Sequence, residues 1–145
     1  MSEHSLAIEN IRHLARLRKL RKELDECDRS FKAFVRLAWS HVEPQELQWG
    51  WHMDAICEHL EAVSAGEILR LLINIPPRHS KSLIVSVIWP MWEWLFAPHQ
   101  KFLCASYSGT LSTRDNLKAR RLIQSPWYQE RWGSVFELTG DQNQK

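Results

Sequence analysis

The chain has 145 residues, of which 44% are hydrophobic, and this size predicts one ordinary domain with a real core. The formal net charge of +2 is close to balance, so only a local cluster of charge could argue for nucleic-acid binding. Three scattered cysteines without a CxxC pair argue against a disulfide framework and a zinc site, and the absence of a signal peptide or long apolar run predicts a soluble protein in a reducing cytosol.

Three helices are expected in the first part of the chain. Between about residues 8 and 24, Leu and Ile recur every three or four residues among Arg and Lys, which is typical of a basic amphipathic helix. That helix either contacts DNA phosphates or a partner, or is a solvated helix packed on the domain. A second helix should begin near Asp28 or Ser30, and a third should run from about Trp51 to a stop at Gly66. The expected inner faces are Phe31, Phe34, Val35, Ala38 and Trp39 for the second helix and Ile56, Leu60 and Val63 for the third.

The middle of the chain alternates apolar segments with helical patterns. Residues 68–75 are almost wholly apolar and stop at Pro76, which predicts a strand buried on both faces. A helix bent or interrupted at Pro90 is expected over 81–96, a second strand over 102–107 and another helix over 110–123. The pattern predicts an α/β fold with an open, mainly parallel sheet, and places ligands beyond the carboxyl ends of its strands, where loop 76–82 lies.

Loop 76–82 has part of the chemistry of a phosphate-binding loop. A polyphosphate needs inward-pointing backbone N–H groups, a helix N-terminus, an ammonium for the β- and γ-phosphates and a hydroxyl for Mg²⁺. Lys81 and Ser82 supply the last two groups, but Ile75 and Ser80 stand where the standard pattern has glycine. Because glycine permits close backbone approach and unusual dihedral angles, Ser80 must either adopt such a conformation or impair the loop. By spacing alone, a plain surface loop is the alternative.

The heptapeptide Pro76-Pro77-Arg78-His79-Ser80-Lys81-Ser82 resembles the variant Walker A loop of phage terminase large subunits, commonly PPRHGKS, and only Ser80 departs from it. The resemblance covers roughly residues 48–133 and continues in three further blocks, Trp89-Pro90-Met91-Trp92, Ala105-Ser106-Tyr107-Ser108 and Ser125-Pro126-Trp127-Tyr128. It implies a P-loop NTPase-like parallel sheet of the additional-strand class. Residues 1–45 would form an N-terminal helical segment, and residues 46–145 the first part of an ATPase domain truncated before the Walker B strand and the nuclease domain.

The activity implied by the resemblance is that of a motor that uses ATP and Mg²⁺ to package double-stranded viral DNA into procapsids. Its implied partners are the portal protein, the small terminase subunit and further copies in a ring, in the host cytoplasm and away from membranes. Lys81 would contact the β- and γ-phosphates, Ser82 would ligate Mg²⁺, and Arg78 would face the phosphates, so Lys81 and Arg78 are the catalytic candidates. Nucleotide binding would also involve Pro77, and His79 and Ser80 through backbone donors. Candidates for an adenine pocket are Gln48, Trp49 and His52, with an ordinary packed helix start as the alternative.

The sequence lacks the acidic pair that a P-loop ATPase needs at the end of an apolar strand to hold Mg²⁺ and polarise water. None of the acidic residues after Ser82 ends an expected apolar strand, so none is assigned a catalytic role; they are Glu93, Asp115, Glu130, Glu137 and Asp141. We therefore expect a truncated gene product or fragment with little or no turnover and no nuclease activity. The rival interpretations are a non-enzymatic docking module with a vestigial loop and another P-loop enzyme, such as a translocase or a kinase.

Overall fold

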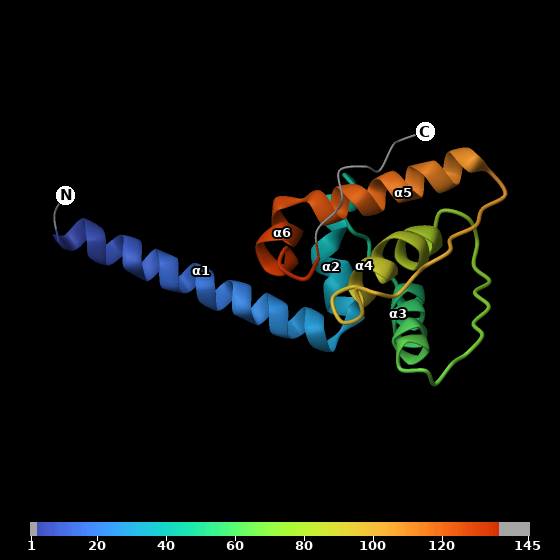
Figure 1. The fold of residues 1–145 in the computed structure, drawn as a ribbon, viewed down its shortest axis with the longest axis horizontal. Coiled ribbons are helices and arrows are strands. Elements are labelled where there is room, and N and C mark those ends of the chain that lie inside the picture. Colours follow the sequence, from blue (N-terminus) through green and yellow to red (C-terminus); the bar gives the residue numbers. More distant parts are fainter. Residues whose placement is uncertain (1–2, 137–145) are drawn as a thin grey trace.

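Figure 1 shows the computed structural model of the chain, which describes residues 3–136. One long helix, α1, projects from a body formed by the remaining helices. The secondary structure assigned to this part of the chain is helical, in the order α1 (Glu3–Arg29), α2 (Phe31–Val42), α3 (Trp51–Ser64), the π-helix η1 (Leu83–Ile88), α4 (Trp89–Glu93), α5 (Gly109–Gln124) and α6 (Pro126–Trp132).

The three expected N-terminal helices are confirmed. The second begins at Ser30 rather than Asp28, because the extended Ser30 caps α2 and its hydroxyl oxygen accepts a hydrogen bond from the backbone N–H of Ala33 at 3.4 Å. The third ends where Gly66 takes φ +77 and its N–H donates to the Val63 carbonyl at 3.0 Å. The predicted inner faces of both helices are buried, except that Val63 is half-buried.

The helical run after the loop continues through Pro90 without a break. Its middle, η1, is a π-helix, and the Trp89 N–H donates to the Ile84 carbonyl, five residues back. Pro90 has no N–H to donate to the carbonyl four residues before it, that of Ser86. The Cys104 thiol lies 4.0 Å from that carbonyl oxygen and donates to it. The expected interruption at Pro90 is therefore a change of helix type.

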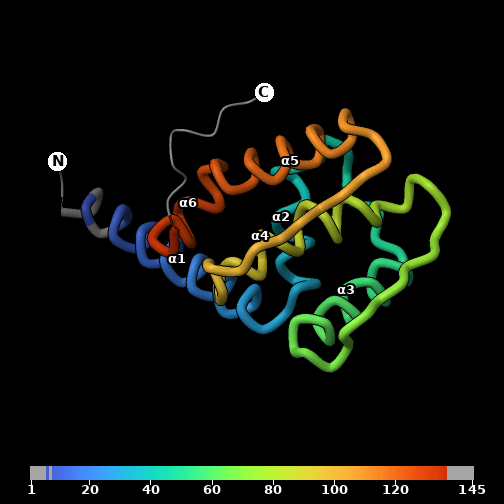
Figure 2. Tube along the Cα trace, turned by 45° about the vertical axis from the view of Figure 1, so that its right-hand side comes forward, coloured from blue at the N-terminus to red at the C-terminus, as the bar shows by residue number. Residues whose placement is uncertain are grey.

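Helix α2 is the centre of the core. It contacts α1, α3, α5, η1 and α4, and α3 and α5 lie on either side of it (Figure 2). Phe34 of α2 is fully buried, and its ring centroid lies 5.6–6.5 Å from those of Trp127, Tyr128 and Trp132. Offset and edge-to-face aromatic pairs of this kind stabilise a core beyond the area that they bury. The Trp127 and Trp132 rings thus serve packing of the core.

The predicted parallel sheet is wrong, because no segment within residues 3–136 forms a strand. Both expected strands lie in long irregular connections (Figure 1). Leu69, Leu72 and Leu103 are 90%, 87% and 97% exposed, so neither segment is buried on both faces, although Leu71, Ile73 and Ile75 pack partly buried against the core. An apolar run favours strand structure, but a sheet also needs a neighbouring strand that pairs its N–H and C=O groups. Helices fill the core instead, and the described part of the chain does not form the P-loop NTPase-like sheet of the additional-strand class.

The helix expected over 110–123 is confirmed as α5, whereas α6 is an element that the sequence analysis did not assign. Its start has a recognisable local signal, since Ser125 caps the helix and Pro126 occupies its first position. The Tyr128 hydroxyl donates to the Met91 carbonyl at 3.1 Å, which links α6 to α4. Burial of this phenol raises the pKa of Tyr128.

Candidate functional site

Loop 76–82 contains two residues in the left-handed region of backbone conformation. Arg78 has φ 67 and Ser80 has φ 58, and they are the positive-φ residues other than glycine in the described part of the chain. A left-handed conformation costs a residue with a Cβ roughly 1–2 kcal/mol, so surrounding contacts must hold it. Ser80 adopts the type of conformation for which glycine is suited, which is the first of the two alternatives posed by the sequence.

Donor groups gather immediately after this turn. The Ile84 N–H donates to the Ser80 carbonyl at 3.0 Å, so the N–H groups of residues 81–83 belong to a first helical turn and have no acceptor four residues back. The Lys81 ammonium lies 3.4 Å from the carbonyl oxygen of Ile73 and donates to it across the loop. Ser82 is exposed. An ammonium, a hydroxyl and first-turn N–H groups therefore adjoin one exposed turn, which is a suitable arrangement for an anion.

His79 connects the loop to helix α3. Its Nδ1 lies 3.0 Å from the Pro77 carbonyl oxygen and 3.2 Å from that of Pro76. Its ring meets the ring of His52 in an edge-to-face contact, with centroids 5.3 Å apart and planes at 75°. His52 is a candidate for an adenine pocket from the sequence, and in the structure it lies against His79 of loop 76–82.

The other two adenine-pocket candidates, Gln48 and Trp49, have different surroundings. Gln48 is exposed, and the Trp49 ring is covered by two cations of α2: the guanidinium carbon of Arg36 lies 4.5 Å and the Lys32 ammonium 5.6 Å from its centroid. Lys32 also pairs with Asp54, and this hydrogen bond lowers the pKa of the Asp54 carboxyl. Trp49 therefore matches the alternative interpretation, a packed helix start.

Ser82 also lines a pocket of about 450 Å³ bounded by η1, α4, α5 and residues 102–106. The lining includes the Asp115 carboxylate, which accepts hydrogen bonds from Arg114 at 2.7 and 2.9 Å. Its other polar residues are Ser86, Ser106, Ser112, Thr113 and Asn116. Ser82 thus connects the loop to the pocket, whereas Arg78 and Lys81 lie outside its lining.

The acidic residues after Ser82 are dispersed. Asp115 lines the pocket, Glu130 pairs with Arg16, and Glu137 and Asp141 lie outside the described residues. Among residues 3–136, no three His, Cys, Asp or Glu side chains gather closely enough to hold a metal ion.

Searches against models of protein families, against curated proteins and against solved structures found no match to this chain. The search for membrane-spanning helices in the described part of the chain found none that is both long and apolar enough. The functional assignment therefore rests on the loop, its contacts and the resemblance of the sequence around it.

Proposed function

We propose that loop 76–82 binds the phosphates of Mg²⁺–ATP, and that the chain is the nucleotide-binding portion of a motor of the terminase large-subunit type. The observation that carries this proposal is the left-handed Ser80, with φ 58, directly before Lys81. At the position where the standard motif has glycine, this loop maintains a glycine-like conformation in spite of its cost. Strained backbone that is maintained in this way is concentrated at functional sites.

Each member of the loop has a role in the proposal. Lys81 exchanges its 3.4 Å contact with the Ile73 carbonyl for the β- and γ-phosphates, which are stronger acceptors for an ammonium. Ser82 supplies its hydroxyl to Mg²⁺, and Arg78, exposed at the tip, faces the phosphates. Pro77 shapes the entry to the turn, and His79 and Ser80 offer backbone donors. Mg²⁺–ATP supplies a phosphoanhydride bond, but without an acidic pair to polarise water this chain binds with little or no turnover.

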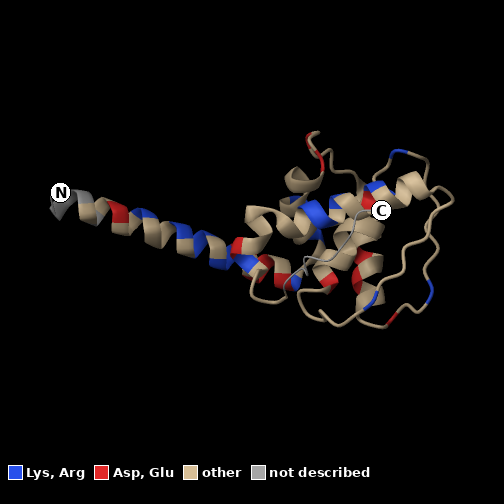
Figure 3. Ribbon diagram, turned by 45° about the horizontal axis from the view of Figure 1, so that its top comes forward, with Lys and Arg blue, Asp and Glu red and all other residues tan. Residues whose placement is uncertain are grey.

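The wider setting of the motor follows from the resemblance of the sequence. Its substrate is double-stranded viral DNA in the host cytoplasm, and its partners are the portal protein, the small terminase subunit and further copies in a ring. The exposed Arg and Lys side chains of α1 support a polyanionic or acidic partner, since phosphates attract such clusters (Figure 3).

A calorimetric titration of the purified chain with a non-hydrolysable ATP analogue and Mg²⁺ tests the proposal. We expect binding by the wild-type chain and by Lys22→Ala, which removes an exposed lysine of α1, and loss of at least about tenfold in affinity in Lys81→Ala. Equal affinity of the two variants would place the nucleotide elsewhere. Circular dichroism confirms that each variant is folded before it is titrated.

A second function, a docking module with a vestigial loop, is favoured by one feature. The projecting part of α1 exposes Ile11, Leu14 and Leu17 by 66%, 52% and 47%, among basic residues (Figure 3). Exposed apolar side chains in a row favour a protein partner. The same titration separates the two functions, because a folded wild-type chain that binds no nucleotide supports the docking module.

A further inference from the structure

We propose that His52 is a positioning residue for the phosphate-binding loop: its ring holds His79 and, through His79, the two left-handed residues on either side of it. The effect on the loop follows from the contacts of the described chain alone. The effect on affinity rests on the proposed function, nucleotide binding by this loop.

His79 lies between the two left-handed residues, Arg78 and Ser80, so its position affects the backbone conformation of both. Both neighbours have positive φ, so their conformations persist only if the intervening residue is held. Inside the loop, His79 is held by the contacts of Nδ1 with the Pro77 and Pro76 carbonyls, at 3.0 and 3.2 Å. These contacts are exposed, so water competes for the carbonyl oxygens and the net stabilisation is modest.

Two side-chain contacts join the loop to other parts of the structure. One is the 3.4 Å hydrogen bond from the Lys81 ammonium to the Ile73 carbonyl, and the other is the edge-to-face contact of His79 with His52. A bound phosphate would draw the ammonium away from Ile73. The His52 contact involves no group that the ligand needs, so it remains in place while the loop binds.

Gly50 explains how the His52 ring comes to lie at the loop. A Cβ at Gly50 would approach the His52 ring to 2.8 Å at Cε1 and 2.9 Å at Nδ1. The backbone at Gly50 has φ −122 and ψ 162, an extended conformation open to any residue, so glycine is not needed for its dihedral angles. What it supplies is space for the imidazole. Because the clash is with the end of a side chain, an alanine at this position can be accommodated by displacing the His52 ring from its present position.

The experiment compares three variants with a control on the same helix. His52→Ala removes the ring, His52→Phe keeps an aromatic edge-to-face contact without imidazole chemistry, and Gly50→Ala displaces the ring. The control is His59→Ala, which removes an exposed imidazole of α3 whose Nδ1 lies 2.7 Å from the Ala55 carbonyl oxygen. The first readout, in the ligand-free chain, is the NMR shift and hydrogen exchange of backbone amides 78–82.

We expect these amides to shift and exchange faster in His52→Ala and Gly50→Ala, to resemble wild type in His52→Phe and to be unchanged in His59→Ala. The second readout is titration with the ATP analogue and Mg²⁺, in which the first two variants should bind about three- to tenfold more weakly, the range expected for one aromatic pair. His52→Phe should restore the affinity.

Unchanged loop amides in His52→Ala would overturn the inference, and so would His52→Phe behaving like His52→Ala. If the loop amides respond as expected but the wild-type chain binds no nucleotide, the proposed function fails and the positioning role of His52 stands. Gly50→Ala keeps the test decisive if His52→Ala unfolds, because it alters the ring position without removing the side chain.

Discussion

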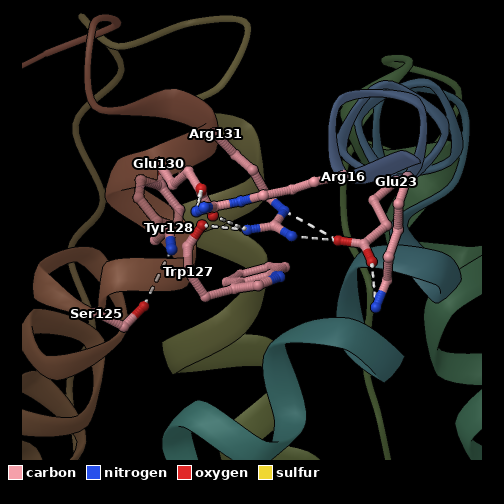
Figure 4. A network of polar contacts seen from close by, with 8 residues as sticks. Arg16, Glu23, Ser125, Trp127, Tyr128, Glu130 and Arg131 are labelled. Atoms are coloured by element: carbon pink, nitrogen blue, oxygen red, sulfur yellow. Dashed lines mark hydrogen bonds and ion pairs between the residues drawn. The ribbon is translucent and has the colours of Figure 1, made fainter. Parts of the chain in front are cut away.

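The guanidinium of Arg131 and the carboxylate of Glu23 form an ion pair that joins α6 to α1, and their side chains are only 8% and 13% exposed (Figure 4). Arg131 Nε donates to Glu23 at 3.0 Å, and its NH1 donates to the Trp127 carbonyl at 2.9 Å. The guanidinium also lies over the Trp127 ring, 5.3 Å from its centroid. Charged groups with so little solvent exposure require such partners, because burial of an uncompensated charge is energetically costly.

Removal of one member of this pair should therefore destabilise the fold. We expect Glu23→Gln to lower the free energy of unfolding by about 2–3 kcal/mol, because Arg131 would stay buried without its main counter-charge. Glu26→Gln is the matched control: it breaks only the exposed pair with Lys22 and should cost less than about 0.5 kcal/mol. Urea denaturation measures both. Equal losses in the two variants would show that the buried pair contributes no more than a surface pair.

Ser80→Gly should stabilise the chain by roughly 0.5–1 kcal/mol, because glycine adopts the observed φ of 58 without steric cost. Ser108→Gly is the comparison, since Ser108 precedes α5 with an ordinary φ of −128 and glycine there should be neutral or slightly destabilising. Thermal unfolding of both variants shows whether each substitution raises or lowers the stability of the chain. A loss of stability in Ser80→Gly would contradict the left-handed conformation of this residue.

Phe34 should be among the most sensitive positions in the core. Its ring is fully buried among aromatic side chains, so Phe34→Ala leaves a cavity and should cost about 3–5 kcal/mol. The same substitution at Phe96, which is 54% exposed and contacts the Trp92 ring, should cost less than about 1 kcal/mol. Urea denaturation of the two variants decides whether the aromatic cluster around α2 is the centre of stability.

His41 should make stability depend on pH. Its ring stacks on Trp127 with centroids 5.0 Å apart; burial lowers the pKa of His41, and the Arg131 charge lowers it further. A lowered folded-state pKa favours the neutral ring, so its stabilisation is present above the ordinary value of 6.5 and is lost as the pH falls towards the folded-state pKa. His41→Phe keeps a stacked ring that takes up no proton. Urea denaturation between about pH 7 and about pH 5 should show a smaller decline for this variant than for wild type.

The cysteines should differ sharply in reactivity. Cys104 is exposed, whereas Cys27 and Cys57 are fully buried, and burial raises the pKa of each buried thiol to about 12. A thiol reagent should therefore modify one cysteine quickly in the native chain and the other two only on unfolding. Cys104→Ser should abolish the fast phase. A fast phase that persists in this variant would mean that the α1–α2 or α3 packing opens readily.

The sequence-based predictions are accurate where the interactions that form an element join residues close together in the chain, and fail where they join distant residues. Ser30, Gly66 and the periodic apolar residues of α2 and α3 act within a few residues, so these helices were predicted with useful boundaries. Segments 68–75 and 102–107 have the composition of buried strands, but strand formation depends on distant partners, and the described chain offers helices instead. The predicted sheet failed for this reason.

By itself, the sequence determined the helices of the N-terminal half, the helix after residue 109, and the loop that places Lys81 and Ser82 after a turn, because helix caps, apolar periodicity and turn residues act locally. Only the tertiary structure decided that Ser80 is left-handed, that His52 lies against His79, and that Glu23 and Arg131 meet. These relationships join residues up to 108 positions apart, and no spacing in the sequence encodes them. They arise from the packing of helices around α2, which brings distant side chains into contact and leaves Leu69, Leu72 and Leu103 of the two apolar connections exposed.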